Sequence, residues 1–232
     1  MTIENYLEKH HIHKSNWLRA AVLGANDGIL SISSIGIGIA SASSSKEQVI
    51  LSVVAGLVAG ALAMASGEYV SVSSQTDTEL ADIEREKIEL KENPELELEI
   101  LTSIYEKRGL KKETASLIAK ELTEFNVLEA HVRDELGITD VNKANPLQAA
   151  LSSGLSFIGG GLLPIIVVLL SPLMYIKYGL YLFSIVFLAI LGAISAHTGG
   201  SSIKKAMIRI VIWGTISMGV SSLVGYLFGV NF

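Results

Sequence analysis

The sequence contains no cysteine, and this absence excludes several kinds of site at once. A chain of 232 residues without Cys forms no disulfide, no thiolate zinc site and no iron–sulfur cluster, and it has no cysteine nucleophile. Charged residues are also scarce, at 18% against roughly 25% in soluble domains. The formal net charge of -5 argues against nucleic acid as the main partner.

The few charges that the chain has are unevenly distributed. Residues 77–143 hold 18 acidic and 10 basic side chains, which is 28 of the 41 charges in the chain. The remaining residues are mostly apolar, and the mean hydropathy of the whole chain is +0.47. This distribution predicts an integral membrane protein that carries one acidic insert outside the bilayer.

Five long stretches carry one charge at most. A membrane-spanning helix needs about 20 predominantly apolar residues. The stretches that meet this requirement are residues 20–45, 48–67, 144–176, 178–203 and 210–232. The first contains Asp27 and is too long for a cleaved signal peptide. We therefore predict an N-terminal arm over residues 1–16, two transmembrane helices within 17–76 and three more within 144–232.

Pairs of glycines four residues apart occur in three of these stretches. The pairs are Gly24 and Gly28, Gly56 and Gly60, and Gly225 and Gly229. Small residues at this spacing let two helix backbones approach closely in lipid. Glycine is also simply tolerated in membrane helices, so each pair indicates a helix contact or nothing at all.

The distribution of lysine and arginine predicts the orientation in the membrane. The loop after the fourth stretch contains Lys204, Lys205 and Arg209, whereas Lys46 and Lys177 stand alone in the loops after the first and third. The acidic insert holds ten basic residues. These counts predict that the N-terminus, the insert and the fourth loop are cytoplasmic and that the C-terminus lies outside. Short loops and the lack of a cleavable signal favour a prokaryotic cell membrane.

The insert itself has the pattern of three helices. We expect them over residues 68–93, 95–107 and 112–136. The first is a continuation of the second transmembrane helix and ends at Asn93-Pro94, while Gly109 and Gly137 end the other two. The spacing of apolar residues predicts a buried stripe on the third helix, formed by Leu117, Ile118, Leu122, Phe125 and Leu128.

Carboxylates line one face of the first of these helices. They follow the spacing i, i+3, i+7 and i+10 and are Glu79, Asp82, Glu86 and Glu89. Like charges on neighbouring turns repel by a few tenths of a kcal/mol per pair, and a bound cation reverses this effect. Ten acids against three bases in residues 77–99 favour cation binding over a merely solvated acidic face. In a chain without Cys, carboxylates suit Mg²⁺, Ca²⁺, Mn²⁺ or Fe²⁺.

Two side chains within the apolar stretches are candidates for function. Asp27 lies about 12 Å of helix beyond Arg19, at a depth where an acid costs several kcal/mol. Met64 lies late in the second stretch, where a methionine is ordinarily a packing residue. A thioether that faces a pore together with a carboxylate would select transition metals over Mg²⁺ and Ca²⁺.

Taken together, four segments of the sequence resemble the vacuolar iron transporter family. They are Asn26-Asp27-Gly28, residues 59–69 (AGALAMASGEY), residues 129–137 (EAHVRDELG) and residues 159–164 (GGGLLP). The resemblance covers nearly the whole chain. It implies an all-α membrane protein with five transmembrane helices and a cytoplasmic three-helix metal-binding domain, here residues 77–143, between helices two and three. It also implies a homodimer that exports Fe²⁺, and often Mn²⁺, from the cytoplasm in exchange for protons.

The resemblance implies roles for individual residues. The expected pathway residues are Asp27, Met64 and Glu68. The expected metal ligands are Glu86, Glu89, Glu97 and Glu135, with Asp82, Glu99 and His131 as further candidates. Ile100 stands where the family commonly has an acid, so Glu99 or Glu95 is left to replace it. His131 stands where some members carry methionine, and an imidazole also binds Fe²⁺ or Mn²⁺.

The resulting hypothesis is a transporter without a prosthetic group and without a catalytic site. The insert captures Fe²⁺ or Mn²⁺, and the ion then passes Met64 and Asp27, where it is exchanged for a proton. The partners are lipid, divalent cations, protons and a second copy of the chain. A passive Mg²⁺ or Mn²⁺ channel and a membrane-bound metal sensor remain alternatives. A membrane-attached ferritin-like di-iron oxidase would use paired Glu-x-x-His motifs, and the sequence has only Glu8-x-x-His11.

Overall fold

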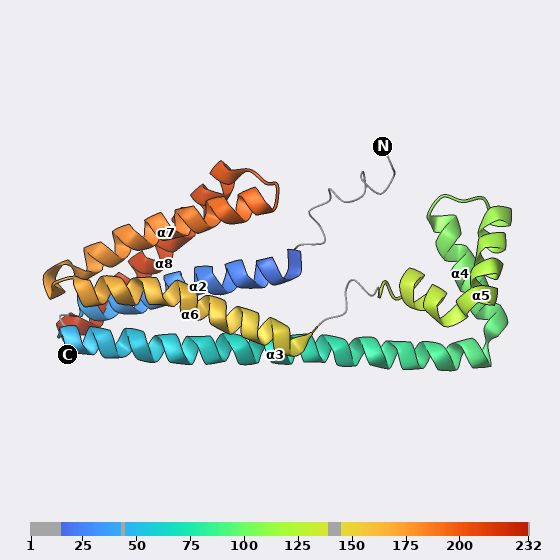
Figure 1. The fold of residues 1–232 in the computed structure, drawn as a ribbon, viewed down its shortest axis with the longest axis horizontal. Helices are drawn as coiled ribbons and strands as arrows, with labels where there is room; N and C mark the ends of the chain where they lie inside the picture. The colour runs from blue at the N-terminus through green and yellow to red at the C-terminus, as the bar shows by residue number, and fades with distance from the viewer. Residues whose placement is uncertain (1–14, 43–44, 139–144, 232) are drawn as a thin grey trace. The chain divides into compact units, whose positions relative to one another are not determined.

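The computed structural model describes residues 15–42, 45–138 and 145–231, and the regular structure in these residues is entirely helical (Figure 1). The seven α-helices of the described residues are α2 (Ser15–Ser41), α3 (Lys46–Glu92), α4 (Pro94–Lys107), α5 (Lys112–Asp134), α6 (Pro146–Leu170), α7 (Ile176–Thr198) and α8 (Ile203–Asn231). A single 3-10 turn, η3 (Leu173–Tyr175), precedes α7. The prediction of an all-α protein is confirmed. The N-terminal arm with Glu8 and His11 lies outside the described residues.

The chain forms two compact units. The membrane unit comprises residues 1–69 and 147–232, and the insert comprises residues 70–146. Helix α3 belongs to both, because its first part lies in the membrane unit and its last part in the insert. The longest uncharged stretch of this helix is residues 48–67, so the hydrocarbon layer can accommodate only its first part.

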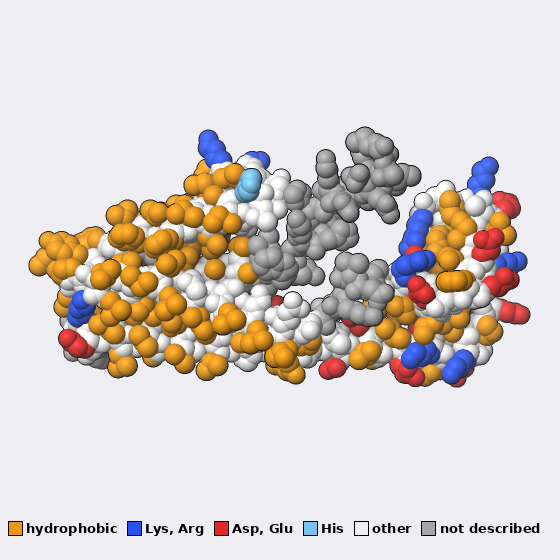
Figure 2. Space-filling model, in the orientation of Figure 1, with side chains coloured by type: hydrophobic (Ala, Val, Ile, Leu, Met, Phe, Trp, Pro, Cys, Tyr) orange, Lys and Arg blue, Asp and Glu red, His pale blue; other side chains and the backbone are white. Residues whose placement is uncertain are grey.

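Five helices in the described residues are long and apolar enough to cross a membrane, as predicted. Their spans are Ala21–Ser41, Lys46–Glu92, Pro146–Leu170, Leu173–Thr198 and Ile203–Gly229. Large apolar side chains stay exposed on this unit, among them Leu51 at 70% and Leu170 at 81% (Figure 2). Such a surface is stable in lipid and would be costly in water, because contiguous apolar patches of this kind are rare on soluble monomers.

All three predicted glycine pairs lie at helix contacts. A Cβ on Gly28 of α2 would overlap the carbonyl oxygen of Phe157 on α6, and one on Gly60 of α3 would overlap the ring of Phe157. A Cβ on Gly225 of α8 would overlap the carbonyl oxygen of Gly38 on α2. The small residues therefore bring the backbones of α2, α6 and α8 together, which maximises van der Waals contact where no hydrophobic effect operates between helices.

The centre of the membrane unit is apolar and is supplemented by hydroxyl pairs. Fully buried members of the core cluster are Ile32, Val49, Val53, Val168, Ile176 and Leu180. The hydroxyls of Ser33 on α2 and Ser184 on α7 lie 2.5 Å apart, and those of Ser41 on α2 and Ser222 on α8 lie 3.0 Å apart. Hydrogen bonds between hydroxyls satisfy these polar groups and fix α2 against α7 and α8.

Two adjacent glycines of α6 provide a test of this packing. A Cβ on Gly160 would overlap the backbone of Ala25, whereas a Cβ on Gly159 would have no atom within 4 Å. We expect Gly160→Ala to lower the free energy of unfolding by about 1–3 kcal/mol, because backbone atoms cannot move aside cheaply. Gly159→Ala should be neutral or slightly stabilising, since Ala favours the helix. Thermal unfolding in detergent measures both, and equal effects would contradict the assigned contact.

The three helices of the insert end where the sequence predicts. Helix α3 ends at Glu92, before Asn93-Pro94, and Pro94 occupies the first turn of α4. Gly109 and Gly137 follow α4 and α5 with φ of 101° and 69°, a left-handed conformation that glycine adopts without a steric penalty. Because the helices end at these residues, the chain can turn back on itself. The last part of α3 forms one small helical unit together with α4 and α5.

The predicted buried stripe of α5 is wrong at two positions. Leu117 is 58% exposed and Phe125 is 85% exposed, whereas Ile118 and Leu122 do pack against the core of the insert. Ala115 and Ala119 are fully buried in their place, beside Leu101 of α4. The face with the small side chains points inward because it lets α4 and α5 approach closely, and Leu117 and Phe125 are left outside.

Helix α5 is also interrupted, although the sequence predicts one continuous helix over residues 112–136. The backbone leaves the helical conformation at Asn126, with φ of -163° and ψ of 90°. The Asn126 side-chain oxygen accepts a hydrogen bond from the Glu129 amide at 3.2 Å, and its amide group donates to the Glu129 carboxylate at 3.0 Å. The first of these hydrogen bonds is an N-cap, so the residues after Asn126 start a new helical segment.

Candidate metal centre

Four side chains from the three helices of the insert converge on one point. They are Glu86 of α3, Glu97 of α4, and His131 and Glu135 at the end of α5. One ligand atom from each lies within 4.8 Å of all the others. Glu86, Glu97 and His131 are buried, with exposed fractions of 3%, 4% and 0%. The sequence-predicted ligands Glu86, Glu97, Glu135 and His131 are therefore brought together.

The imidazole of His131 lies at the centre of this cluster. Its Nδ1 is 2.9 Å from a carboxylate oxygen of Glu86, 2.9 Å from one of Glu135 and 3.8 Å from one of Glu97. The ring is fully buried, and its Nε2 has no hydrogen-bond partner among the described residues. The side chain of Glu135 is 30% exposed, so the cluster is reached from solvent past this carboxylate.

The charge balance of the cluster is unfavourable without a cation. Burial raises the pKa of Glu86 and Glu97 above 4.5, the repulsion from Glu135 raises both further, and His131 only partly opposes these effects. Three carboxylates around one imidazole leave a surplus of negative charge even when His131 is protonated. A divalent cation at this point would remove the repulsion and restore the ionised carboxylates.

The remaining predicted ligands lie outside the cluster. Glu89 is exposed, yet close enough for its charge to raise the pKa of Glu86 and Glu97. Asp82 forms an exposed ion pair with Arg85 at 3.2 Å, one turn along α3. Glu99 is exposed, because two residues beyond Glu97 a helix has turned by more than half a revolution.

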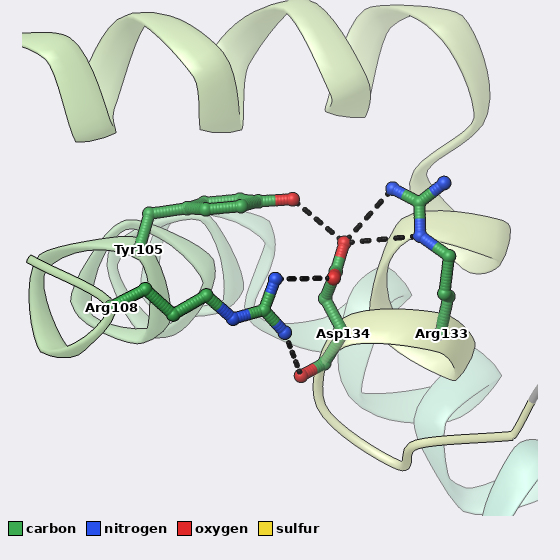
Figure 3. A network of polar contacts seen from close by, with 4 residues as sticks. All are labelled: Tyr105, Arg108, Arg133 and Asp134. Atoms are coloured by element: carbon green, nitrogen blue, oxygen red, sulfur yellow. Dashed lines mark hydrogen bonds and ion pairs between the residues drawn. The ribbon is translucent and has the colours of Figure 1, made fainter. Parts of the chain in front are cut away.

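A polar network beside the cluster fixes the end of α5 (Figure 3). Asp134 accepts hydrogen bonds from the Tyr105 hydroxyl at 2.7 Å and from Arg108 at 2.7 Å, both at the end of α4. Arg133 donates to the same carboxylate at 3.0 Å. Burial raises the pKa of Asp134, but the three donors outweigh it and lower the pKa from 3.8 to about 2. The network holds α5 to α4 next to Glu135, and no pattern in the sequence predicts it.

Asp134→Asn should therefore destabilise the insert. The depressed pKa contributes about 2 kcal/mol of stability above the unfolded-state pKa of 3.8, and this is lost as the pH falls toward 2. We expect Asp134→Asn to lose a comparable amount at neutral pH, measured by hydrogen exchange of the α4 and α5 amides in the full chain. Asp82→Asn is the matched control and should lose a few tenths of a kcal/mol at most, because its ion pair is exposed. Equal protection in both variants would contradict a stabilising role for the network.

The predicted pathway residues lie on two helices of the membrane unit. Asp27 of α2 is half-buried and accepts a hydrogen bond from the Ser31 hydroxyl at 2.6 Å. The neighbouring Asn26 side-chain oxygen is buried and has no hydrogen-bond partner in the described part of the chain. Met64 of α3 is half-buried and packs against the apolar core of the membrane unit, and Glu68 follows one turn later. Their joint role in a pathway stays a prediction.

The fold and the cluster define an integral membrane protein with a helical insert whose buried carboxylates and imidazole suit a divalent cation. The chain belongs to the VIT family, whose profile matches residues 18–226. It is 41% identical over 223 residues to a protein of Acanthamoeba castellanii named vacuolar iron transporter, covering 95% of this chain and 82% of that one. It is 31% identical over 223 residues to vacuolar iron transporter homolog 1 of Oryza sativa subsp. japonica, covering 96% and 78%. It is also 31% identical over 225 residues to VIT-like transporter 1b of Glycine max, covering 95% and 80%.

Proposed function

We propose that this protein moves a divalent transition metal, Fe²⁺ first and Mn²⁺ second, across a membrane in exchange for protons. The observation that carries the proposal is the convergence of Glu86, Glu97, His131 and Glu135 in the insert of a chain with five membrane-length helices. The names of its relatives in the VIT family support iron as the cargo.

The donor set supports this choice of metal. Three carboxylates and one imidazole combine oxygen ligands, which suit Mn²⁺ as well as Mg²⁺ and Ca²⁺, with a nitrogen ligand that suits Fe²⁺. The absence of Cys removes the thiolates that would favour zinc or copper. In this proposal the insert captures the ion and raises its concentration near the membrane.

The ion then passes Met64 and Glu68 on α3 and reaches Asp27 on α2. Asp27 binds either the metal or a proton, so that protons moving inward drive the metal outward. Its half-buried side chain and its hydrogen bond from Ser31 support this role, because they hold a carboxylate within reach of both ions. Met64 supplies a soft thioether that disfavours Mg²⁺ and Ca²⁺.

We place the insert in the cytoplasm, so that transport is export from the cytoplasm. The basic residues Lys204, Lys205 and Arg209 near the start of α8 support this orientation by the positive-inside rule. A prokaryotic cell membrane stays a prediction from the short loops, and two of the three relatives carry the word vacuolar in their names.

A homodimer is also part of the proposal. The insert leaves large apolar side chains in solvent, with Phe125 85% exposed, Leu80 60% and Leu117 58%. A second copy of the chain would cover such side chains at little cost, because exposed apolar patches commonly mark interaction surfaces.

Flux measurements in proteoliposomes test the transport proposal. We expect Fe²⁺ flux to increase when a pH gradient drives protons in the opposite direction. We also expect added Mn²⁺ to reduce this flux by competition. Flux that is indifferent to the pH gradient would favour the passive channel. Metal binding without any flux would favour the sensor, and oxidation of bound Fe²⁺ by the full chain would favour the di-iron oxidase. Each of these three results would overturn the proposal of a proton-coupled transporter.

The affinity of the insert for metal should depend on pH with a definite sign. Because burial raises the pKa of Glu86 and Glu97, protons compete with the metal at pH values above 4.5, where an ordinary carboxylate is already ionised. We expect the Kd for Mn²⁺ to increase as the pH is lowered toward these pKa values, as measured by calorimetry on the full chain. Replacing Glu97 with Gln should flatten this dependence. A Kd that does not change with pH would contradict the cluster as the binding site.

A further inference from the structure

The first turns of α8 carry an open cavity on the surface of the membrane unit. Its volume is about 350 Å³, and its lining consists of Lys205, Ile208, Arg209, Ile212 and Trp213. The volume lies within the range of roughly 300–1,000 Å³ that is typical of small-ligand pockets. Nothing in the proposed transport mechanism uses these residues.

The lining residues share one face of α8 and divide into two ends. Lys205 and Arg209 are four residues apart and therefore lie one turn above each other. Trp213 lies a further turn along the helix toward the apolar part of the span and is 65% exposed. Ile208 and Ile212, exposed at 49% and 52%, fill the space between the ends. The cavity thus has a cationic end near the start of the helix and an apolar end deeper in the span.

Within the described part of the chain, the two basic side chains have no acidic partner. Neither Lys205 nor Arg209 forms an ion pair with any residue that the structure describes, and α7 and α8 contain no Asp or Glu. The acids of the described membrane unit are Asp27, Glu47 and Glu68, all on α2 and α3. Figure 2 shows Lys and Arg side chains projecting at the top of this unit, near a His side chain, with no Asp or Glu beside them in this view. An anionic ligand would supply the missing charge.

We propose that this cavity binds an anionic phospholipid. The phosphate lies between Lys205 and Arg209, and the acyl chains follow Ile208, Ile212 and Trp213 into the bilayer. Basic side chains beside a span attract anionic headgroups, and an interfacial Trp suits the boundary between headgroup and acyl chain. A free phosphate ion would need the cationic end only and would leave the apolar end unexplained. The inference rests on the position of α8 in a bilayer and does not depend on metal transport.

Fluorescence quenching of Trp213 tests the proposal in the full-length chain. The chain has two tryptophans, so Trp17→Phe leaves Trp213 as the only one. The protein is reconstituted in phosphatidylcholine that contains a minor fraction of a lipid brominated on its acyl chains. We expect brominated phosphatidylglycerol to quench Trp213 more than brominated phosphatidylcholine at the same fraction. The corresponding local enrichment is on the order of fivefold per basic side chain.

Matched variants separate the site from general membrane charge. The double variant Lys205→Gln and Arg209→Gln should abolish the preference for the anionic lipid. The control double variant Lys46→Gln and Lys177→Gln removes the same charge at the starts of α3 and α7 and should keep the preference. Circular dichroism and the unfolding temperature confirm that both variants remain folded.

Three results would overturn the proposal. Equal quenching by the two brominated lipids would mean that Lys205 and Arg209 only set the orientation of the chain in the membrane and do not select an anionic lipid. Loss of the preference in excess inorganic phosphate would assign the cationic end to a free anion. Protection of Trp213 from both lipids would show that a second copy of the chain covers the face.

Discussion

Replacing Glu97 with Gln should weaken metal binding to the insert by about 10- to 100-fold, or roughly 1.4–2.8 kcal/mol. Two unit charges 4 Å apart interact by about 4 kcal/mol at an effective dielectric constant near 20. A divalent cation carries two unit charges, so its attraction to the Glu97 carboxylate is larger. The net loss is smaller than that, because Gln keeps an oxygen ligand and the neighbouring carboxylates remain.

The same substitution should have the opposite effect on the metal-free protein. Glu97 is 4% exposed, and its pKa is raised by burial and by Glu135, so its ionised form destabilises the fold at neutral pH. Glu97→Gln removes this charge and should raise the unfolding temperature of the insert without metal. The stabilisation on adding Mn²⁺ should shrink at the same time. A cluster that served only the fold would show no such reversal.

Glu99→Gln is the matched control for this experiment. Glu99 lies on the same helix, carries the same charge and is exposed outside the cluster. We expect its Kd for Mn²⁺ and its unfolding temperature to stay close to those of the wild type. Calorimetry and thermal unfolding of the full chain give both quantities. If Glu99→Gln weakened binding as much as Glu97→Gln, the acidic segment would be a diffuse cation-attracting face and not a site.

Local rules predicted the helices of the insert well. The break at Asn93-Pro94 follows from the missing amide hydrogen of proline, and Gly109 and Gly137 end helices in the left-handed conformation. Such signals act within a few residues, so they can be recognised without the rest of the fold. The capping pair of Asn126 and Glu129 belongs to the same class, and the Asn-x-x-Glu spacing was available in the sequence.

Local rules could not predict which face of α5 is buried, because that depends on packing against another helix. Periodicity assigned Leu117 and Phe125 to the buried face of α5 because they are large and apolar, but Ala115 and Ala119 form the contact with α4. The choice between the two faces depends on how closely α4 and α5 approach. That distance depends in turn on Leu101, which lies in another helix.

The cluster shows the same division between local and tertiary information. The acidic face and the family resemblance both pointed to Glu86, and the resemblance added Glu97 and Glu135. Neither distinguished these carboxylates from Glu89 and Glu99, which lie outside the cluster. Only the meeting of three helices determines which carboxylates face His131, because each helix presents several acids to different sides.

Asp27→Asn should abolish proton-coupled transport while leaving metal capture intact. The substitution preserves size and keeps an acceptor for the Ser31 hydroxyl, which lies 2.6 Å from Asp27. It removes the carboxylate that, in the proposed mechanism, binds either a proton or the metal within the bilayer. We expect flux driven by a pH gradient to fall at least about tenfold, or about 1.4 kcal/mol in the barrier. The Kd of the insert for Mn²⁺ should not change.

Glu47→Gln is the control for the membrane unit. Glu47 is an exposed acid at the start of α3, so its loss changes the net charge equally without altering the interior of the unit. Its flux should match that of the wild type. Asp27→Glu should recover part of the flux, since a carboxylate is restored one methylene further from the backbone. Undiminished, gradient-dependent flux in Asp27→Asn would exclude Asp27 as the coupling residue.

The two substitutions should also affect different parameters of the same flux curve. A capture site sets how much metal is needed, so Glu97→Gln should raise the concentration for half-maximal flux and leave the maximum nearly unchanged. A coupling residue sets how fast bound metal crosses, so Asp27→Asn should lower the maximum. Because the two residues lie in separate units, their effects on the free energy should add in the double variant. A strong departure from additivity would mean that the insert takes part in the crossing step itself.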